Sequence, residues 1–221
     1  MFHWLEKNPF LFTVMVFVTI AFAGIITILP DFAKSSRPVV GTKPYTILQL
    51  TGRHVYIKDS CNACHSQLIR PFKSETDRYG AYSLSGEYAY DRPFLWGSKR
   101  TGPDLMRVGN YRTTDWHENH MWNPTSVVPG SIMPAYKHHF TNIADVETAY
   151  AEAYTVKTVF DVPYDQEGMP KLGTLEEAQA AALEEAKVIA AGMKNQDVKD
   201  KVAAGQIPEI VALIAYLNSL K

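Results

Sequence analysis

Residues 61–65 read Cys-Asn-Ala-Cys-His, and they contain both cysteines of the 221-residue chain. Two thiols with this spacing and an imidazole directly behind them are compatible with a disulfide, a redox dithiol, half of a zinc site or a haem attachment site. The four chemistries belong to different folds. The rest of the sequence therefore has to decide between them.

The composition excludes several classes of protein. The formal net charge is −1 and 46% of the residues are hydrophobic, so neither nucleic-acid binding nor general disorder is indicated. Two cysteines cannot build a multi-bridge secreted scaffold. The length suits one compact domain together with an additional segment.

The additional segment is an apolar run, FLFTVMVFVTIAFAGIITIL at residues 10–29, which contains no charged residue. Such a run forms a helix of about 30 Å, the thickness of the hydrocarbon core of a bilayer. Ala21-Phe22-Ala23 resembles a signal-peptide cleavage site, but the apolar run continues well beyond it. We therefore predict a short N-terminus at 1–9, an uncleaved transmembrane anchor at 10–29, a linker at 30–45 and one domain at 46–221.

The pattern after the linker predicts a mainly α domain with long loops. Apolar residues at 46–60 indicate a short helix that leads into CNACH, whereas residues 66–135 are rich in Gly, Pro, Tyr and Trp without a sustained period. A final helix is expected from Pro208, a residue suited to a first helical turn, to Leu220.

A further helix is predicted inside the segment 141–206. Thr174 and Glu177 have the spacing of a capping box, and an alanine-rich run continues to Ala191. Because its amphipathic character is weak, we interpret 141–206 as a helical insertion with a solvated or partner-facing helix.

The residues around CNACH favour haem over the other three chemistries. A zinc site would need a second ligand pair, from His117 and His120 or from His138 and His139, and it would leave the imidazole behind the motif without a role. A thioredoxin-like dithiol needs a βαβ pattern, which the sequence does not show. In c-type haem attachment every residue of the motif has a role: Cys61 and Cys64 form thioethers and His65 binds the iron.

A sixth iron ligand is then expected, and Met133 is the best candidate. It lies in PGSIMPAY, between two prolines that restrict the backbone on both sides. His/Met ligation raises the haem potential and closes the iron to small molecules, which suits electron transfer. His117 or His120 is the competing distal ligand.

Several longer motifs surround CNACH in a fixed order. They are GTKPYTILQLTGRHVY (41–56), CNACHSQLIRPF (61–72), RYG (78–80), RPFLWGSKRTGPDLMRVG (92–109), DWHENHMWNP (115–124) and VVPGSIMPAY (127–136). Together they resemble the membrane-anchored mono-haem cytochrome c subunit (subunit II) of cbb3-type cytochrome c oxidases. The resemblance covers the chain from the anchor to about Tyr136 and resumes in the last helix. Between about 141 and 206 the chain departs from the simplest family pattern.

The resemblance implies a class I cytochrome c fold with one covalently bound haem c. It assigns the haem to Cys61, Cys64, His65 and Met133. By the same analogy Gly52 and Tyr56 of the first helix should pack against Leu213 and Tyr216 of the last helix.

The resemblance also implies a contact between the WGSKRTGPDL loop and the catalytic subunit, near haem propionates and a bound calcium ion. Ser98 is the expected calcium contact, and Arg53 the expected propionate contact. Pro103 is expected to pack near His65 at the haem edge.

The implied function is electron transfer in a haem–copper terminal oxidase that pumps protons and reduces oxygen to water. The chain would be a non-catalytic subunit that receives electrons from a further cytochrome c subunit or a soluble cytochrome c and passes them to the catalytic subunit. A membrane-tethered cytochrome shuttle, the small subunit of a nitric oxide reductase and a haem peroxidase are the alternatives.

The expected location is the bacterial inner membrane. Lys7 precedes the anchor and Lys34, Arg37 and Lys43 follow it, which weakly favours a cytoplasmic domain. Haem attachment requires the opposite orientation, because in bacteria it takes place outside the inner membrane. We therefore predict a single-pass protein with a periplasmic domain in contact with membrane lipid.

Overall fold

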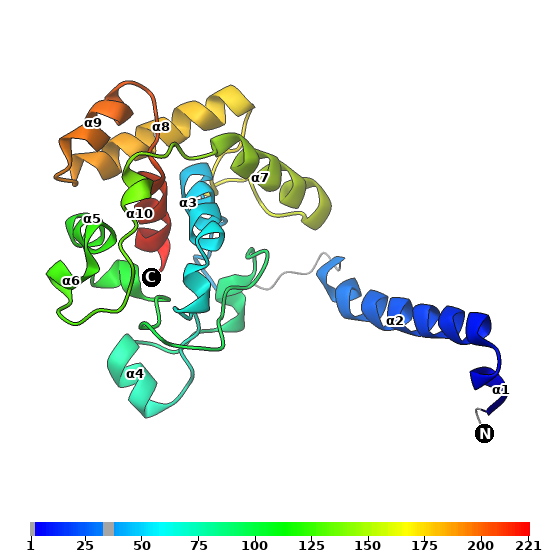
Figure 1. The fold of residues 1–221 in the computed structure, drawn as a ribbon. Helices are drawn as coiled ribbons and strands as arrows, with labels where there is room; N and C mark the ends of the chain where they lie inside the picture. Colours follow the sequence, from blue (N-terminus) through cyan, green and yellow to red (C-terminus); the bar gives the residue numbers. More distant parts are fainter. Residues whose placement is uncertain (1–2, 33–37) are drawn as a thin grey trace.

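The computed structural model of the protein describes residues 3–32 and 38–221, which form helices joined by long loops (Figure 1). Within these residues the only β pairing is an isolated bridge between Ile143 and Pro208. The mainly α fold is therefore as predicted. The helices are α1 (His3–Glu6), α2 (Pro9–Phe32), α3 (Ile47–Lys58), η1 (Cys61–Ala63), α4 (Lys73–Tyr79), η2 (Ser85–Tyr88), η3 (Val108–Asn110), α5 (Thr114–Trp122), α6 (Pro124–Val127), η4 (Lys137–Phe140), α7 (Val146–Phe160), α8 (Leu175–Ala191), α9 (Gln196–Ala203) and α10 (Glu209–Ser219).

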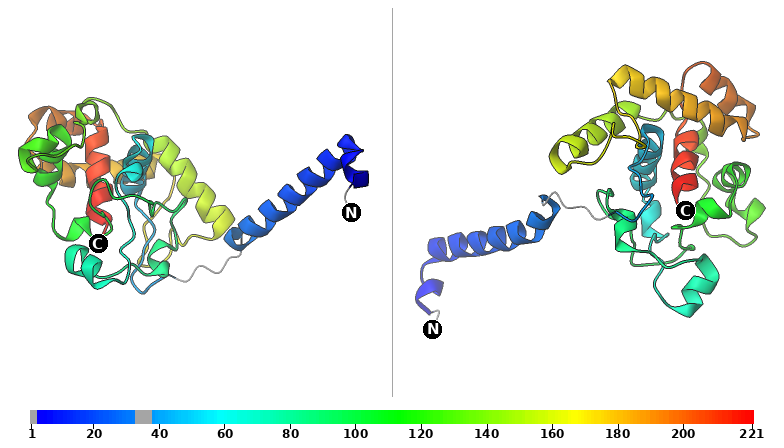
Figure 2. Two further views of the ribbon diagram at one scale, coloured as in Figure 1. Left: turned by 60° about the horizontal axis from the view of Figure 1, so that its bottom comes forward. Right: turned by 180° about the vertical axis from the view of Figure 1, so that it is seen from behind.

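Helix α2 contains the predicted anchor. Its stretch Pro9–Leu29 is long and apolar enough to cross a membrane, and none of its most apolar window is buried against the rest of the described chain. Both views of Figure 2 show α2 extending away from the helical body. A long apolar helix that is not buried against the rest of the described residues fits a membrane span.

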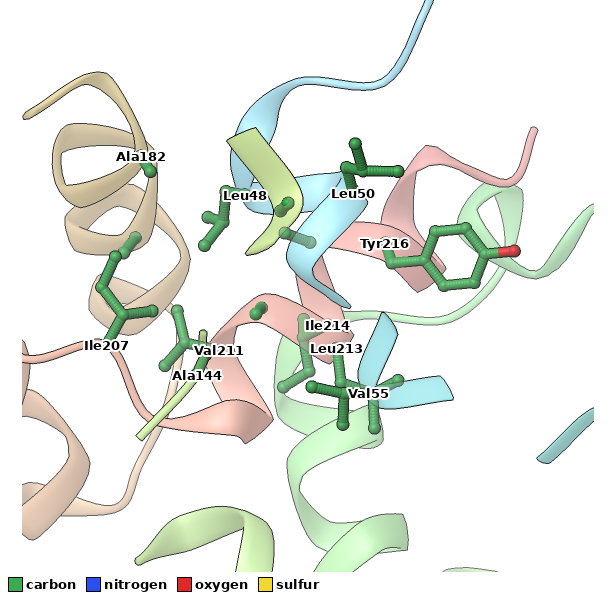
Figure 3. Packing of buried hydrophobic residues seen from close by; sticks show 14 of the residues in the cluster. Leu48, Leu50, Val55, Ala144, Ala182, Ile207, Val211, Leu213, Ile214 and Tyr216 are labelled. Carbon is green, nitrogen blue, oxygen red and sulfur yellow. The ribbon is translucent and has the colours of Figure 1, made fainter. Parts of the chain in front are cut away.

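Helices α3 and α10 pack against each other at the centre of the body, and their side chains form most of the core shown in Figure 3. Helix α3 begins at a capping box, in which the Thr46 side chain accepts from the Gln49 N–H and the Gln49 side chain accepts from the Thr46 N–H. Helix α10 is buried on all sides from Glu209 to Leu217. Pro208 was expected in the first turn of this helix. It is instead the N-cap, and α10 begins one residue later, at Glu209.

The two central helices approach closely at Gly52. A Cβ atom on this residue would lie 1.9 Å from the carbonyl oxygen of Ala212 and 2.9 Å from Cβ of Tyr216. The Tyr56 and Tyr216 rings meet edge to face with 5.5 Å between their centroids. The expected packing of the first helix on the last is confirmed for Gly52, Tyr56 and Tyr216.

The interpretation of the alanine-rich helix α8 as solvated or partner-facing holds for one face only, because the opposite face is buried. Ala178, Ala182, Ala186 and Ala190 form a fully buried stripe that packs on α3 and α10. Because alanine is small, α8 can approach α3 and α10 closely. The same small side chains add little to the amphipathic pattern of the sequence. The Glu185 carboxylate also accepts from the Thr46 hydroxyl at 2.7 Å and thereby ties α8 to the start of α3.

The segment 141–206 shares the hydrophobic core of the rest of the body. Helix α7 packs on α3, and the Tyr164 hydroxyl donates to the carbonyl of Tyr45 at 2.9 Å. The Glu118 carboxylate of α5 accepts from the backbone N–H groups of Lys194 and Asn195, at 2.6 and 2.7 Å. The segment therefore supports both the central helices and α5.

Candidate functional site

The His65 imidazole is held in one tautomer by the loop that follows residue 96. Its Nδ1 lies 2.9 Å from the carbonyl oxygen of Pro103. A carbonyl oxygen can only accept, so Nδ1 carries the proton and the lone pair is on Nε2. Burial lowers the pKa of His65, which favours the neutral ring. The side chain is therefore in the form that ligates a metal, with its other nitrogen fixed by a backbone acceptor.

Gly102 allows this loop to lie against the His65 ring. A Cβ at this position would lie 2.2 Å from Cε1 and 2.6 Å from Nδ1 of His65. The Gly102 N–H donates to the carbonyl of Cys64 at 2.9 Å, and the Leu105 N–H donates to that of Ser66 at 2.8 Å. The expected proximity of Pro103 to His65 is confirmed. The role of Gly102 was missed, although its place directly before Pro103 is a recognisable loop signal.

Asp104 fixes the backbone that follows the motif. Its side chain is fully buried and accepts from the Ser66 hydroxyl at 2.6 Å, the Leu68 N–H at 2.8 Å and the Met106 N–H at 2.9 Å. Arg100 donates from Nε to the Ser66 hydroxyl at 2.7 Å. A buried carboxylate with several donors holds two loops in register. Sequence reasoning gave no role to Asp104, because Ser66 and Leu68, which it holds, are 38 and 36 residues away in the chain.

The two cysteines lie on the turn before His65. Cys61 is half-buried in η1 and Cys64 is exposed, and both are free thiols. The His65 N–H donates to the carbonyl of Cys61 at 2.9 Å, so the three side chains belong to one tight turn. Burial, and then the charge of Asp59, raise the pKa of Cys61 to about 12, and its thiol is protonated at neutral pH.

Helix α5 contributes two histidines, of which His117 is buried and His120 is half-buried. Nε2 of His117 and Nδ1 of His120 are buried without a hydrogen-bond partner. Burial lowers the pKa of His120 to about 4, and repulsion from His65 lowers it further. Burial, followed by repulsion from His120, also lowers the pKa of His117 to about 4. Buried, neutral imidazoles with unpartnered nitrogens suit the wall of a cofactor cleft.

Met133 lies on the loop between α6 and η4. It is half-buried against the main core, and its N–H donates to the Ser131 hydroxyl at 3.2 Å. The loop is attached to α5, since the Tyr136 N–H donates to the carbonyl of Met121 at 2.8 Å. Burial is the main cause that raises the pKa of Tyr136, and its interaction with Cys61 adds to this effect. The pairing of Met133 with His65 across one iron stays a prediction.

Arg53 and Ser98 lie in different surroundings. The Arg53 side chain is buried, and its guanidinium donates to the carbonyl of Arg92 at 2.7 Å and to that of Pro93. It thereby anchors the start of the WGSKRTGPDL loop, a role that the sequence did not suggest. Its contact with a propionate stays a prediction. Ser98 is exposed on the same loop, and nothing among the described residues supports calcium there.

The turn and its surroundings fit a c-type haem. Two free thiols precede an imidazole with a free Nε2, Gly102 leaves room for that ring, and unpartnered imidazole nitrogens lie nearby. No curated protein matches the chain. The model of one family, described as cytochrome c oxidase, mono-heme subunit/FixO, matches residues 2–221 and so includes the segment 141–206. One haem c and a place in an oxidase or related complex follow from this match. The chain therefore belongs to the FixO family of mono-haem cytochrome c oxidase subunits.

Proposed function

We propose that the chain passes single electrons through a His/Met-ligated haem c to the catalytic haem–copper subunit of a terminal oxidase, which reduces oxygen to water. The observation that carries the proposal is the His65 imidazole, fixed through Nδ1 with Nε2 free, directly behind two free thiols. Cys61 and Cys64 would hold the haem covalently, and His65 and Met133 would ligate the iron. A further cytochrome c subunit or a soluble cytochrome c would be the electron donor.

When bound, the haem supplies a one-electron carrier whose His/Met ligation raises its reduction potential. The protein supplies the surroundings. The Pro103 carbonyl orients the His65 ring, and the attachment of the Met133 loop to α5 through Tyr136 restrains the thioether. Cys61 packs against the main core, to which α3 and α10 contribute, and this core keeps water away from that side of the turn. Such burial favours rapid electron transfer, because few groups have to reorganise.

The sixth ligand is tested by comparing Met133→Ala with His120→Ala. The oxidised wild-type protein should show the weak long-wavelength absorption band of sulfur–iron charge transfer. We expect Met133→Ala to abolish this band and to lower the potential, because the weak thioether ligand is lost. His120→Ala should keep the band. Retention of the band in Met133→Ala would reject Met133 as the ligand.

We propose that the catalytic subunit binds the loop after Pro93, whose start is held by the Arg53 guanidinium. Phe94 and Trp96 stack on each other with 4.5 Å between their centroids, and both are exposed. Exposed, rigid aromatic side chains are typical of protein interfaces. Ser98 is exposed on the same loop. We propose that it contacts a calcium ion only when the catalytic subunit is bound.

The proposed location is the bacterial inner membrane, with α2 as a single-pass anchor and the helical body in the periplasm. The apolar length of α2 supports the anchor. The orientation rests on the haem, whose attachment in bacteria takes place on the outer side of this membrane. Residues 1–9 would then be cytoplasmic, 30–45 the linker and 46–221 the cytochrome domain, with 141–206 as its additional helical part.

Purification of the tagged chain in mild detergent, with haem and metal analysis of the proteins that accompany it, tests the function. Haem b together with copper is the expected result. Haem b with non-haem iron would support a nitric oxide reductase, and a lone haem c would support a tethered shuttle. Carbon monoxide binding by the reduced, isolated chain would support an open iron site and a peroxidase. Trp96→Ser should reduce recovery of the partner, whereas Val188→Ser, an exposed control on α8, should not.

A further inference from the structure

A second group of potential metal ligands lies at the end of α3. Asp59, His138 and His139 each offer one ligand atom, and these atoms lie within 4.8 Å of one another. Oδ2 of Asp59 is 2.8 Å from Nε2 of His138 and 3.0 Å from Nε2 of His139. Ligands at the usual Zn–N and Zn–O distances of about 2.0–2.2 Å are themselves separated by about 3.3–3.6 Å in tetrahedral coordination. The three atoms are therefore almost in position to share one ion.

The His139 ring gives the strongest indication of a ligand. Its side chain has 0% exposure, and its Nδ1 lies 3.0 Å from Oε2 of Glu209. A carboxylate oxygen accepts, so Nδ1 carries the proton and Nε2 of the neutral ring has the lone pair. Nε2 has no hydrogen-bond partner and faces the Asp59 carboxylate. Two electron-rich atoms at this distance repel each other unless a proton or a cation lies between them.

The surrounding charges agree with a cation. Two carboxylates face the His139 ring, Asp59 at its Nε2 and Glu209 at its Nδ1. The positive group nearby, Lys58, is already paired with Glu209 at 2.5 Å. Glu209 in turn has the position of an outer carboxylate that orients a metal-binding histidine.

We propose that Asp59, His138 and His139 bind one divalent transition-metal ion of the zinc class, with Glu209 orienting His139. Two imidazoles and one carboxylate suit zinc, and water would complete the coordination. The His138 side chain is 47% exposed, which gives the ion a path from solvent. The site does not use the cysteines and is separate from the haem iron.

The ion would join three segments of the body. Asp59 ends α3, the two histidines lie on η4, and Glu209 begins α10. Helix η4 follows the loop that carries Met133, so the ion would restrain the C-terminal end of that loop. Metal binding to the folded protein stabilises it by mass action.

Zinc binding by the haem-containing, full-length chain tests this site. The protein is treated with a chelator, incubated with Zn²⁺ alone and desalted, and its zinc and haem contents are measured separately. One zinc per chain is expected, together with an increase in the thermal unfolding midpoint. X-ray absorption at the zinc edge should show nitrogen and oxygen ligands without sulfur, which distinguishes this site from free cysteines left by incomplete haem attachment.

Variants locate the ion. His138→Gln and Asp59→Asn should each lose the zinc and its stabilising effect, and both should keep the wild-type circular dichroism spectrum and haem content. His54→Gln is the matched control, since His54 also pairs with a carboxylate, that of Glu152. It should bind zinc as the wild type does. Absence of bound zinc, sulfur ligation, or binding that survives both ligand substitutions would overturn the proposal.

Discussion

Gly52→Ala should destabilise the protein by at least about 2 kcal/mol, because a methyl group at this position collides with the backbone of α10. The added Cβ would lie 1.9 Å from the Ala212 carbonyl oxygen, and a backbone atom of a packed helix cannot move aside alone. Alanine gains about 1 kcal/mol in helix propensity over glycine, which the collision outweighs. For a chain of this size, the thermal midpoint should fall by about 5 °C or more.

The measurement is thermal unfolding of the detergent-purified protein by far-UV circular dichroism. Gly192→Ala is the control, since the nearest atoms to its added Cβ, on Ile189 and Thr114, lie at an ordinary 3.5 Å. Its midpoint should stay within about 2 °C of the wild type. A Gly52→Ala protein as stable as this control would show that α3 and α10 do not cross as described.

Gly102→Ala should disrupt the ligation of the haem iron while leaving the haem covalently attached. The new Cβ would lie 2.2 Å from Cε1 of His65, so the ring has to move away and lose its bond to the Pro103 carbonyl. Cys61 and Cys64 lie outside this collision. The absorption and electron paramagnetic resonance spectra should change from low-spin to high-spin, and the reduced protein should bind carbon monoxide.

Thr101→Ala provides the comparison for this substitution. Thr101 is the exposed neighbour of Gly102 on the same loop, and its replacement should leave the spectra unchanged. The pyridine haemochrome spectrum reports whether both thioether bonds are still present. A low-spin spectrum in Gly102→Ala that matches the wild type would rule out the proposed position of His65 against the loop.

Local sequence signals predicted the helices that begin with a recognisable cap or contain a continuous apolar pattern. The Thr174–Glu177 box lies where expected, and α2 agrees with the apolar run at 10–29. The burial of α8 could not be predicted in the same way. Alanine has little hydrophobic contrast with its neighbours, so a stripe that packs through its small size leaves almost no periodic signal.

The centre of the site was predictable and its supports were not. A five-residue motif specifies the two thiols and the imidazole, because the chemistry fixes their spacing. The supports come from residues far away in the chain, such as the Asp104 carboxylate under Ser66 and the carbonyl of Pro103 on His65. Their contacts depend on how the loop folds back, which no local pattern encodes.

The packing of α3 on α10 also means that the core cannot form until almost the whole domain has been synthesised. About 150 residues separate the end of α3 at Lys58 from the start of α10 at Glu209. At about 5–20 residues per second, the ribosome needs roughly 8–30 s to deliver the second helix after the first. During this interval α3 has no partner for its buried face, and CNACH lies on a nascent chain that has not closed. We expect the CNACH thiols to be most accessible to haem attachment during this interval, before α3 and α10 pack.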